Sequence, residues 1–255
     1  MDPIAFGVGP FTVPWYGLMI FTASVLGEIL LLWLAWREGI PLHKILVWLI
    51  FLIIGGMSGA KLASAILHPL MSGRCIQFHD HQGMVSYGAL VGVLAAGWAF
   101  SRLQDVSLWK LLDIAMPPVA LGFALSRVGC FLGGCCYGRP TDLPWGVTFP
   151  PFSPAWMEFG DAPVHPAQLY AVAGNLLLLL VLLALRRRKP FDGFLFLSWM
   201  GLYAGLRFTL EYFRADPRVA LGMTAAQLAN LVIGPAALAL LWIKMKEHIP
   251  TGNGL

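Results

Sequence analysis

Seven windows of about 20 mainly apolar residues constrain this sequence more than any other feature, because a helix of that length crosses the hydrocarbon core of a bilayer. The windows are Pro14–Trp36, Ile45–Leu67, Met84–Phe100, Leu112–Leu132, Pro166–Leu185, Phe191–Phe213 and Met223–Ile243. Glycines interrupt the second and third windows. The sequence therefore predicts an all-α, polytopic membrane protein with seven transmembrane helices.

Composition agrees with this class and indicates a single domain. Apolar residues make up 58% of the chain and charged residues 12%, which is about half the charged fraction of soluble domains. We expect residues 1–255 to form one integral membrane domain without repeats. Residues 1–13 lack the basic region of a cleavable signal peptide, so the first span should stay as a helix.

The distribution of basic residues predicts the orientation. With the N-terminus outside, the cytoplasmic side holds most of them, namely Arg37, Lys44, Arg102, Lys110, Arg186, Arg187, Arg188, Lys189, Lys244 and Lys246. The outer side holds Arg74, Arg139, Arg214 and Arg218. We therefore expect the N-terminus outside and the C-terminus in the cytoplasm. Topology also accounts for the net charge of +4, so we expect no nucleic-acid partner.

Two arginines lie inside the predicted spans. Arg127 closes the apolar run Leu111–Leu125, and Arg207 lies within Phe191–Phe213. A charge at membrane depth is costly, so it usually has a partner and a function. The planar guanidinium group donates paired hydrogen bonds to phosphate or carboxylate oxygens. The two residues therefore predict a membrane site for an anionic lipid headgroup.

Polar residues of six spans fall at one depth. With a rise of about 1.5 Å per residue, Arg127 and Arg207 lie roughly 23 Å above the cytoplasmic edge of a core about 30 Å thick. The residues expected near the same outer level are Tyr16, Lys61, Tyr87, His165 and Gln168. Tyr203 and Glu211 lie four residues before and after Arg207, on the same helical face. Glu211 either orients or neutralises Arg207, or forms a structural ion pair that tightens helix packing.

The longest extramembrane segment follows the fourth window, which the pair Gly133 and Gly134 should end. This segment, at about 137–165, is rich in proline and carries the aromatic residues Trp145, Phe149, Phe152, Trp156 and Phe159. Such aromatic side chains settle at the level of the lipid headgroups. We expect an outer interfacial arm on the membrane, which either gates access to the site or is a passive loop.

All four cysteines fall on the predicted outer side, where disulfides are permitted. They are Cys75, Cys130, Cys135 and Cys136. Cys75 could pair with any of the others, Cys135 and Cys136 could have a redox role, and Cys130 could be apolar filler. A zinc site is disfavoured, because the spacing Cys-x4-Cys-Cys fits no standard ligand pattern and His79 and His81 belong to a separate loop.

Several of these residues fall in five motifs that are spread over nearly the whole chain, in the same order as in a known protein family. The motifs are Trp15–Leu18, Gly59–Leu62, Ser126–Arg139, His165–Tyr170 and Tyr203–Arg214. Together they resemble the signature of bacterial prolipoprotein diacylglyceryl transferases. The resemblance implies an enzyme of the bacterial plasma (inner) membrane. It moves the diacylglyceryl group of phosphatidylglycerol to the lipobox cysteine of prolipoprotein signal peptides and releases glycerol phosphate.

The resemblance also implies the site residues. We assign catalytic roles to Arg127, Arg207, Tyr87 and His165, and substrate-binding roles to Tyr16, Lys61, Gly138, Gln168, Tyr203 and Glu211. Two arginines in a low-dielectric site could stabilise the charge that develops on the phosphate leaving group. The nucleophile is a substrate thiol, which is weak until it is deprotonated. Neither a metal nor an organic cofactor is expected.

The sequence departs from the family pattern at several positions. Tyr87-Gly88-Ala89 stands where the family has His-Gly-Gly, and Lys61 replaces an arginine. Cys130 and Gly133 replace signature asparagines, and Cys135 replaces an acidic residue. These changes indicate a divergent branch.

The first departure, Tyr87 in place of a histidine, concerns the group that takes the proton from the substrate thiol. Tyr87 could donate a hydrogen bond to phosphate, but a tyrosine with a pKa of about 10 is a poor base at neutral pH. His165 is the substitute that we consider. Two other functions therefore stay open: a non-catalytic lipid-binding or transport paralogue of the same fold, and a membrane thiol oxidoreductase that uses the outer cysteines.

Overall fold

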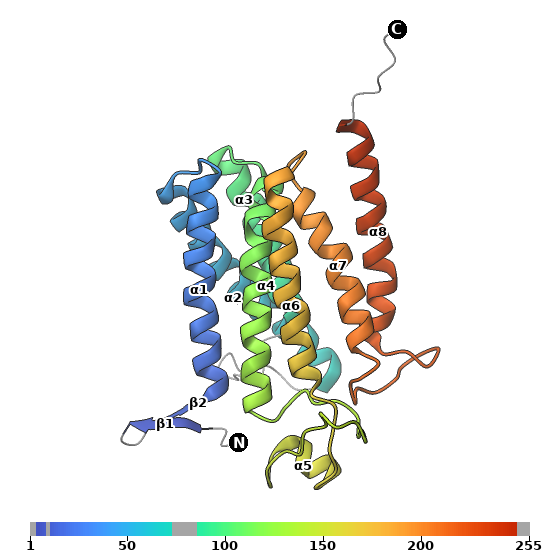
Figure 1. Cartoon of the computed structure of the whole chain (residues 1–255). Helices are drawn as coiled ribbons and strands as arrows, with labels where there is room; N and C mark the ends of the chain where they lie inside the picture. The colour runs from blue at the N-terminus through green and yellow to red at the C-terminus, as the bar shows by residue number, and fades with distance from the viewer. Residues whose placement is uncertain (1–3, 9–10, 73–85, 249–255) are drawn as a thin grey trace. The chain divides into compact units, whose positions relative to one another are not determined.

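The computed structural model describes residues 4–8, 11–72 and 86–248, which form a helical chain with one short hairpin (Figure 1). In chain order, the elements are β1 (Ile4–Val8), β2 (Phe11–Pro14), α1 (Trp15–Arg37), α2 (Leu42–Ser72), α3 (Ser86–Gln104), α4 (Leu108–Leu132), α5 (Pro154–Phe159), α6 (Ala167–Leu185), the 3₁₀ turn η2 (Arg186–Arg188), α7 (Phe194–Leu210) and α8 (Ala225–His248). Each of the seven predicted windows overlaps one helix. The β1–β2 hairpin before α1 is an element that the sequence analysis does not predict.

Five helices in the described part are long and apolar enough to cross a membrane. They are Trp15–Arg37, Leu42–Ile66, Leu108–Leu132, Ala167–Arg188 and Ala225–His248. This pattern is that of a polytopic membrane protein. The remaining two predicted spans correspond to α3 and to α7, whose 17 residues make it a shorter apolar helix.

Contacts divide the chain into two compact units. The unit Leu32–Leu111 holds α2 and α3, which pack through glycines. A Cβ atom on Gly59 would overlap the carbonyl oxygen of Gly88, and one on Gly92 would overlap that of Gly55. Small residues at this spacing allow close backbone approach between membrane helices. The glycines that interrupt the second and third windows therefore form the contact between the two helices.

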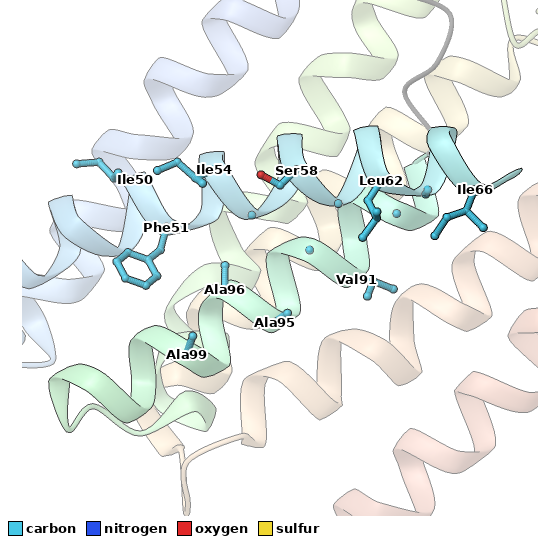
Figure 2. Close-up of a pocket in the computed structure, with 15 residues that line it drawn as sticks. Ile50, Phe51, Ile54, Ser58, Leu62, Ile66, Val91, Ala95, Ala96 and Ala99 are labelled. Atoms are coloured by element: carbon cyan, nitrogen blue, oxygen red, sulfur yellow. The ribbon is translucent and has the colours of Figure 1, made fainter. Parts of the chain in front are cut away.

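An apolar groove of about 870 Å³ runs beside this glycine contact (Figure 2). Its walls include Ile54, Leu62 and Ile66 from α2 and Val91 and Ala95 from α3. Isoleucine and leucine side chains here are more than half exposed. Such a surface is suited to contact with lipid chains, as expected for helices in a bilayer.

The other unit comprises Met1–Leu31 and Leu112–Leu255. Its core joins Met116 and Ala120 of α4 to Leu182 of α6 and Leu195 of α7. Near this core, the carboxylate of Asp113 is fully buried. It accepts hydrogen bonds from the backbone N–H groups of Gly193 (2.8 Å) and Phe196 (2.9 Å) at the start of α7.

Asp113 therefore satisfies N–H groups that the first turn of a helix leaves without intrahelical partners. Lys189 Nζ lies 3.4 Å from its Oδ2 atom and compensates the charge. These contacts fix the start of α7 to the start of α4. Asp113 has no role predicted from the sequence, because its partners are distant in sequence.

Candidate functional site

The end of α4, the start of α6 and the end of α7 are tied together by backbone hydrogen bonds. Gly138 donates to the carbonyl of His165 (3.0 Å), His165 donates to that of Arg139 (2.9 Å), and Arg139 donates to that of Phe213 (2.9 Å). The start of α1 joins them, since a Cβ atom on Gly129 would lie 3.2 Å from the Tyr16 Cα atom. Helix ends from distant parts of the sequence thus converge.

A small pocket lies where these helices meet. Its lining comprises Arg127, Ala167, Ala171, Asn175, Tyr203, Arg207, Leu210 and Arg214. Arg127 of α4 and Arg207 of α7 therefore line one pocket, although 80 positions separate them in sequence. A third arginine, Arg214, lies in the same wall. We expect such a cluster of guanidinium groups to favour a phosphate or carboxylate group.

Glu211 connects two of the three arginines. Its carboxylate is 1% exposed, and Oε1 forms an ion pair with Nη1 of Arg207 one helical turn before it. The same oxygen lies 3.6 Å from Nε of Arg214. In the part of the chain that the structure describes, Arg127 makes no ion pair. The pocket thus holds more positive than negative charge.

Arg214 is a site residue that the sequence analysis counts only for topology. Its Nε and Nη2 atoms donate to the two carboxylate oxygens of Asp216, at 2.9 and 3.1 Å. Burial works against its charge, but the hydrogen bond and charge of Asp216, together with the negative groups around it, raise the pKa of Arg214 above its usual value. Its position at the end of the Tyr203–Arg214 motif is the signal that could have identified it.

Asn175 is a second residue that the sequence analysis misses. It lies on α6, is 3% exposed, and lines the pocket. Its Nδ2 atom donates to the carbonyl of Ala171 (2.8 Å), whereas Oδ1 has no hydrogen-bond partner among the described residues. A buried acceptor without a partner is rare in folded proteins. The available signal was an asparagine inside an otherwise leucine-rich helix.

Tyr203 reaches the pocket from α7, on the face that its spacing from Arg207 predicts. Its ring stacks on Trp199, with centroids 4.9 Å apart and planes inclined by 12°. The centroid of the Phe123 ring lies 5.3 Å from that of Tyr203. These two rings restrict the tyrosine side chain. The phenol is therefore held in the pocket wall by aromatic packing.

Three predicted site residues lie around the helix ends and have specific partners. His165 Nδ1 is 3.2 Å from the hydroxyl of Tyr170, which also accepts a hydrogen bond from Trp145 Nε1 (2.8 Å). Gln168 is 1% exposed and donates through Nε2 to the carbonyl of Cys135 (2.8 Å). The Gly138 amide already donates to His165, so in this structure Gly138 contributes close backbone packing.

The remaining predicted site residues are differently placed. Tyr16 is half exposed at the start of α1. Lys61 on α2 and Tyr87 on α3 belong to the Leu32–Leu111 unit, and the Tyr87 side chain falls outside the described part. The roles assigned to these three residues stay predictions, as do those of the other site residues.

The expected outer arm is folded around a small core of its own. Phe149, Ala155 and Val164 are buried together and pack against Phe131 of α4. The hydroxyl of Tyr137 donates to Glu158 Oε2 at 2.5 Å. Burial, together with this hydrogen bond, raises the pKa of Tyr137 to about 12. The arm is thus attached to the end of α4 through apolar contacts.

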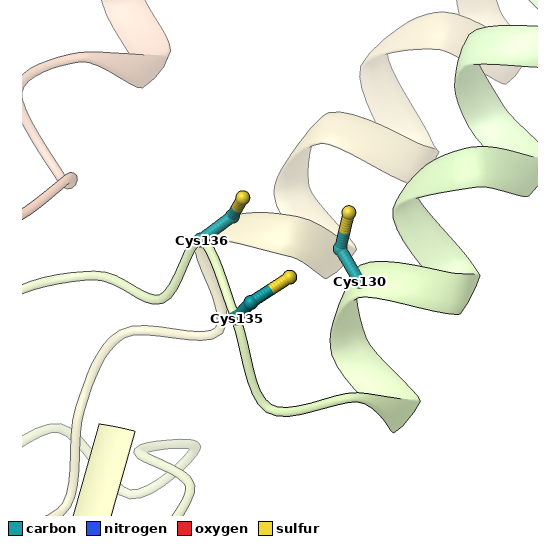
Figure 3. Close-up of side chains that lie close together, drawn as sticks. All are labelled: Cys130, Cys135 and Cys136. Atoms are coloured by element: carbon teal, nitrogen blue, oxygen red, sulfur yellow. The ribbon is translucent and has the colours of Figure 1, made fainter. Parts of the chain in front are cut away.

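Three of the four cysteines lie together at the end of α4 (Figure 3). Cys130, Cys135 and Cys136 are free thiols whose sulfur atoms lie within 4.8 Å of one another. Cys75, with the disulfide considered for it, lies outside the described residues, as do His79 and His81. The sequence spacing alone did not predict this cluster, because a backbone turn produces it.

The helices and the pocket define a class, namely a polytopic membrane protein with a pocket lined by half-buried arginines. The chain belongs to the prolipoprotein diacylglyceryl transferase family, whose model matches residues 3–243. The family resemblance carried by the sequence motifs is therefore confirmed.

Individual relatives agree with this family. A protein of Dehalococcoides mccartyi is 32% identical over 98% of this chain and 96% of its own length. One of Pseudomonas syringae is 32% identical, covering 97% and 94%, and one of Geobacter sulfurreducens is 34% identical, covering 88% and 86%. Each is named phosphatidylglycerol-prolipoprotein diacylglyceryl transferase.

Proposed function

We propose that this protein transfers the diacylglyceryl group of phosphatidylglycerol to the lipobox cysteine of prolipoproteins. The observation that carries the proposal is the pocket shared by Arg127 and Arg207. Family membership and the names of the relatives support the same reaction. The half-buried guanidinium groups would bind the phosphate of the lipid headgroup.

The proposed reaction is a displacement at the glyceryl carbon that bears the phosphate. The substrate thiolate forms the new C–S bond while the C–O bond breaks, and glycerol phosphate leaves with the electron pair. Arginines held in a low-dielectric pocket stabilise the charge that grows on the leaving phosphate. Glu211 holds Arg207 in position, so the donor needs no reorganisation during the reaction. His165 and Tyr87 are the proposed candidates for handling the thiol proton.

We further propose seven membrane spans, with the N-terminus outside and the pocket at the outer face of the bacterial inner membrane. Two observations within the unit that comprises Met1–Leu31 and Leu112–Leu255 support this orientation. The basic run Arg186–Arg188 follows the C-terminal end of α6, and the pocket residues Ala167 and Ala171 lie at its N-terminal end. Basic residues favour the cytoplasmic side.

The test is a transfer assay with the full chain in vesicles that contain labelled phosphatidylglycerol and a lipobox peptide. We expect label on the peptide cysteine, and a loss of at least about 100-fold for Arg127→Ala and for Arg207→Ala, since a single donor to a developing oxyanion is commonly worth that much. Full activity in both variants would overturn the mechanism. Lipid binding without transfer by the folded wild type would favour the lipid-binding alternative.

A further inference from the structure

The three clustered thiols take no part in the proposed transfer, yet several features of the fold bring them together. Cys130 is 8% exposed in the last turn of α4. Cys135 and Cys136 lie within the four residues that follow this helix and are half-buried. Figure 3 shows the Cys135 side chain extending toward Cys130. Three ligand atoms within 4.8 Å of one another form a compact donor set.

A helix cap creates this arrangement. The amide of Cys135 donates to the carbonyl of Cys130 (3.1 Å), and that of Gly134 donates to the carbonyl of Phe131 (3.2 Å). With Gly134 at φ +66°, this is a Schellman motif. The chain thereby folds back over the end of α4 and brings Cys135 next to Cys130.

Cys136 completes the cluster in a conformation that non-glycine residues rarely adopt. Its φ is +61°, in the left-handed region that is unfavourable for a residue with a Cβ atom. Gln168 fixes the preceding residue by donating to the carbonyl of Cys135. The turn therefore holds the third thiol beside the other two at a conformational cost.

We propose that Cys130, Cys135 and Cys136 bind one zinc ion through three thiolates. A Zn–S distance of about 2.3 Å at the tetrahedral angle separates the sulfur atoms by about 3.8 Å, which lies within the 4.8 Å spread of the cluster. Binding releases the protons of the thiols to solvent. Among the described residues, the donor group comprises these three side chains. A tetrahedral ion therefore keeps its fourth position for water or another exogenous ligand.

The test is a zinc titration of the full chain in detergent, reduced, freed of metal with a chelator and kept without oxygen. We expect one zinc ion per chain, release of protons, and protection of three thiols from alkylation. Cys136→Ser should lower zinc affinity at least about 100-fold, because losing a ligand costs more than losing a residue that only orients one. Cys135→Ser tests the same point if Cys136→Ser does not fold.

The matched control is Cys75→Ser, which removes the other cysteine of the chain. Its zinc stoichiometry and affinity should equal those of the wild type, and loss of binding would overturn the three-thiolate assignment. Absence of zinc binding by reduced wild-type protein that elutes as a folded species would also overturn it. So would a disulfide between any two of the three thiols in the zinc-treated protein. None of these results depends on transfer activity.

Discussion

Arg207 and Glu211 form an ion pair one helical turn apart at the end of α7, and the carboxylate is 1% exposed. Because the same carboxylate oxygen also approaches Arg214, one buried negative charge compensates two arginines that line the pocket. A buried pair of this kind contributes little net stability, but removing one partner leaves an uncompensated buried charge. The ion pair therefore makes the position of Arg207 sensitive to Glu211.

Glu211→Gln should destabilise the protein by about 3 kcal/mol, because it leaves Arg207 and Arg214 without their shared carboxylate. We also expect transfer activity to fall about 10-fold or more in the protein that remains folded, since Arg207 is no longer oriented. Thermal unfolding in detergent and the vesicle assay measure the two effects.

Asp216→Asn is the control for Glu211→Gln, because Asp216 also contacts Arg214 but its side chain is 37% exposed. An exposed ion pair contributes at most about 1 kcal/mol. Equal destabilisation by the two substitutions would contradict the importance of the buried carboxylate.

The sequence predicts the arginine site through two regular patterns. Helical rise places Arg127 and Arg207 at one depth, and helical periodicity places Tyr203 and Glu211 on one face with Arg207. All four positions follow from distances along single helices. In the structure, Arg127, Arg207 and Tyr203 line one pocket, and Glu211 forms an ion pair with Arg207.

Other features could not be derived in this way, because they depend on contacts between distant segments. Asn175 becomes a pocket residue only when α6 packs beside α4 and α7. Arg214 lies beyond the end of α7, where the periodicity no longer applies. The thiol cluster depends on a left-handed turn at Gly134 and Cys136, and the spacing Cys-x4-Cys-Cys contains no sign of it.

Asn175→Leu should reduce activity without reducing stability. Its Oδ1 atom is buried without a hydrogen-bond partner among the described residues, so replacing the amide with an apolar group can be neutral or stabilising. If Oδ1 accepts a hydrogen bond from a hydroxyl of the lipid headgroup, its loss should raise KM for phosphatidylglycerol about 10-fold, which corresponds to about 1.4 kcal/mol.

Asn230→Leu is the matched control for Asn175→Leu. Asn230 on α8 makes the same contact, with Nδ2 donating to the carbonyl four residues earlier (2.7 Å), but it does not line the pocket. We expect an unchanged KM for this variant. An unchanged KM for Asn175→Leu would show that Oδ1 has no part in substrate binding.

Gly138→Ala should impair both folding and activity. A Cβ atom at this position would lie 2.5 Å from the carbonyl oxygen of Phe213 and 2.6 Å from the His165 Cβ atom. Relieving these overlaps requires the ends of α4, α6 and α7 to separate, which should cost about 2 kcal/mol or more. Thermal unfolding and transfer activity measure the result.

Gly122→Ala serves as the control, because a Cβ atom there has no neighbour within 4 Å. Gly122 lies inside α4, so alanine should stabilise the helix by up to about 1 kcal/mol. A similar loss of stability in both variants would show that close packing at Gly138 is not the cause.

Asp113→Ala should lower the free energy of unfolding by about 3 kcal/mol while leaving the chemistry of the pocket intact. The substitution leaves the buried N–H groups of Gly193 and Phe196 without their acceptor, and each such group costs about 1–3 kcal/mol. It also leaves Lys189 without its buried counter-charge.

Asp192→Ala is the control for Asp113→Ala, because the Asp192 carboxylate contacts the same lysine at 2.9 Å but is 41% exposed. This substitution should therefore cost less than about 1 kcal/mol. Asp113 lies near the start of α4 and the pocket arginine Arg127 near its end, so KM and kcat per folded molecule should match the wild type. A change in KM for Asp113→Ala at full folding would instead show that the start of α7 determines the geometry of the arginine pocket.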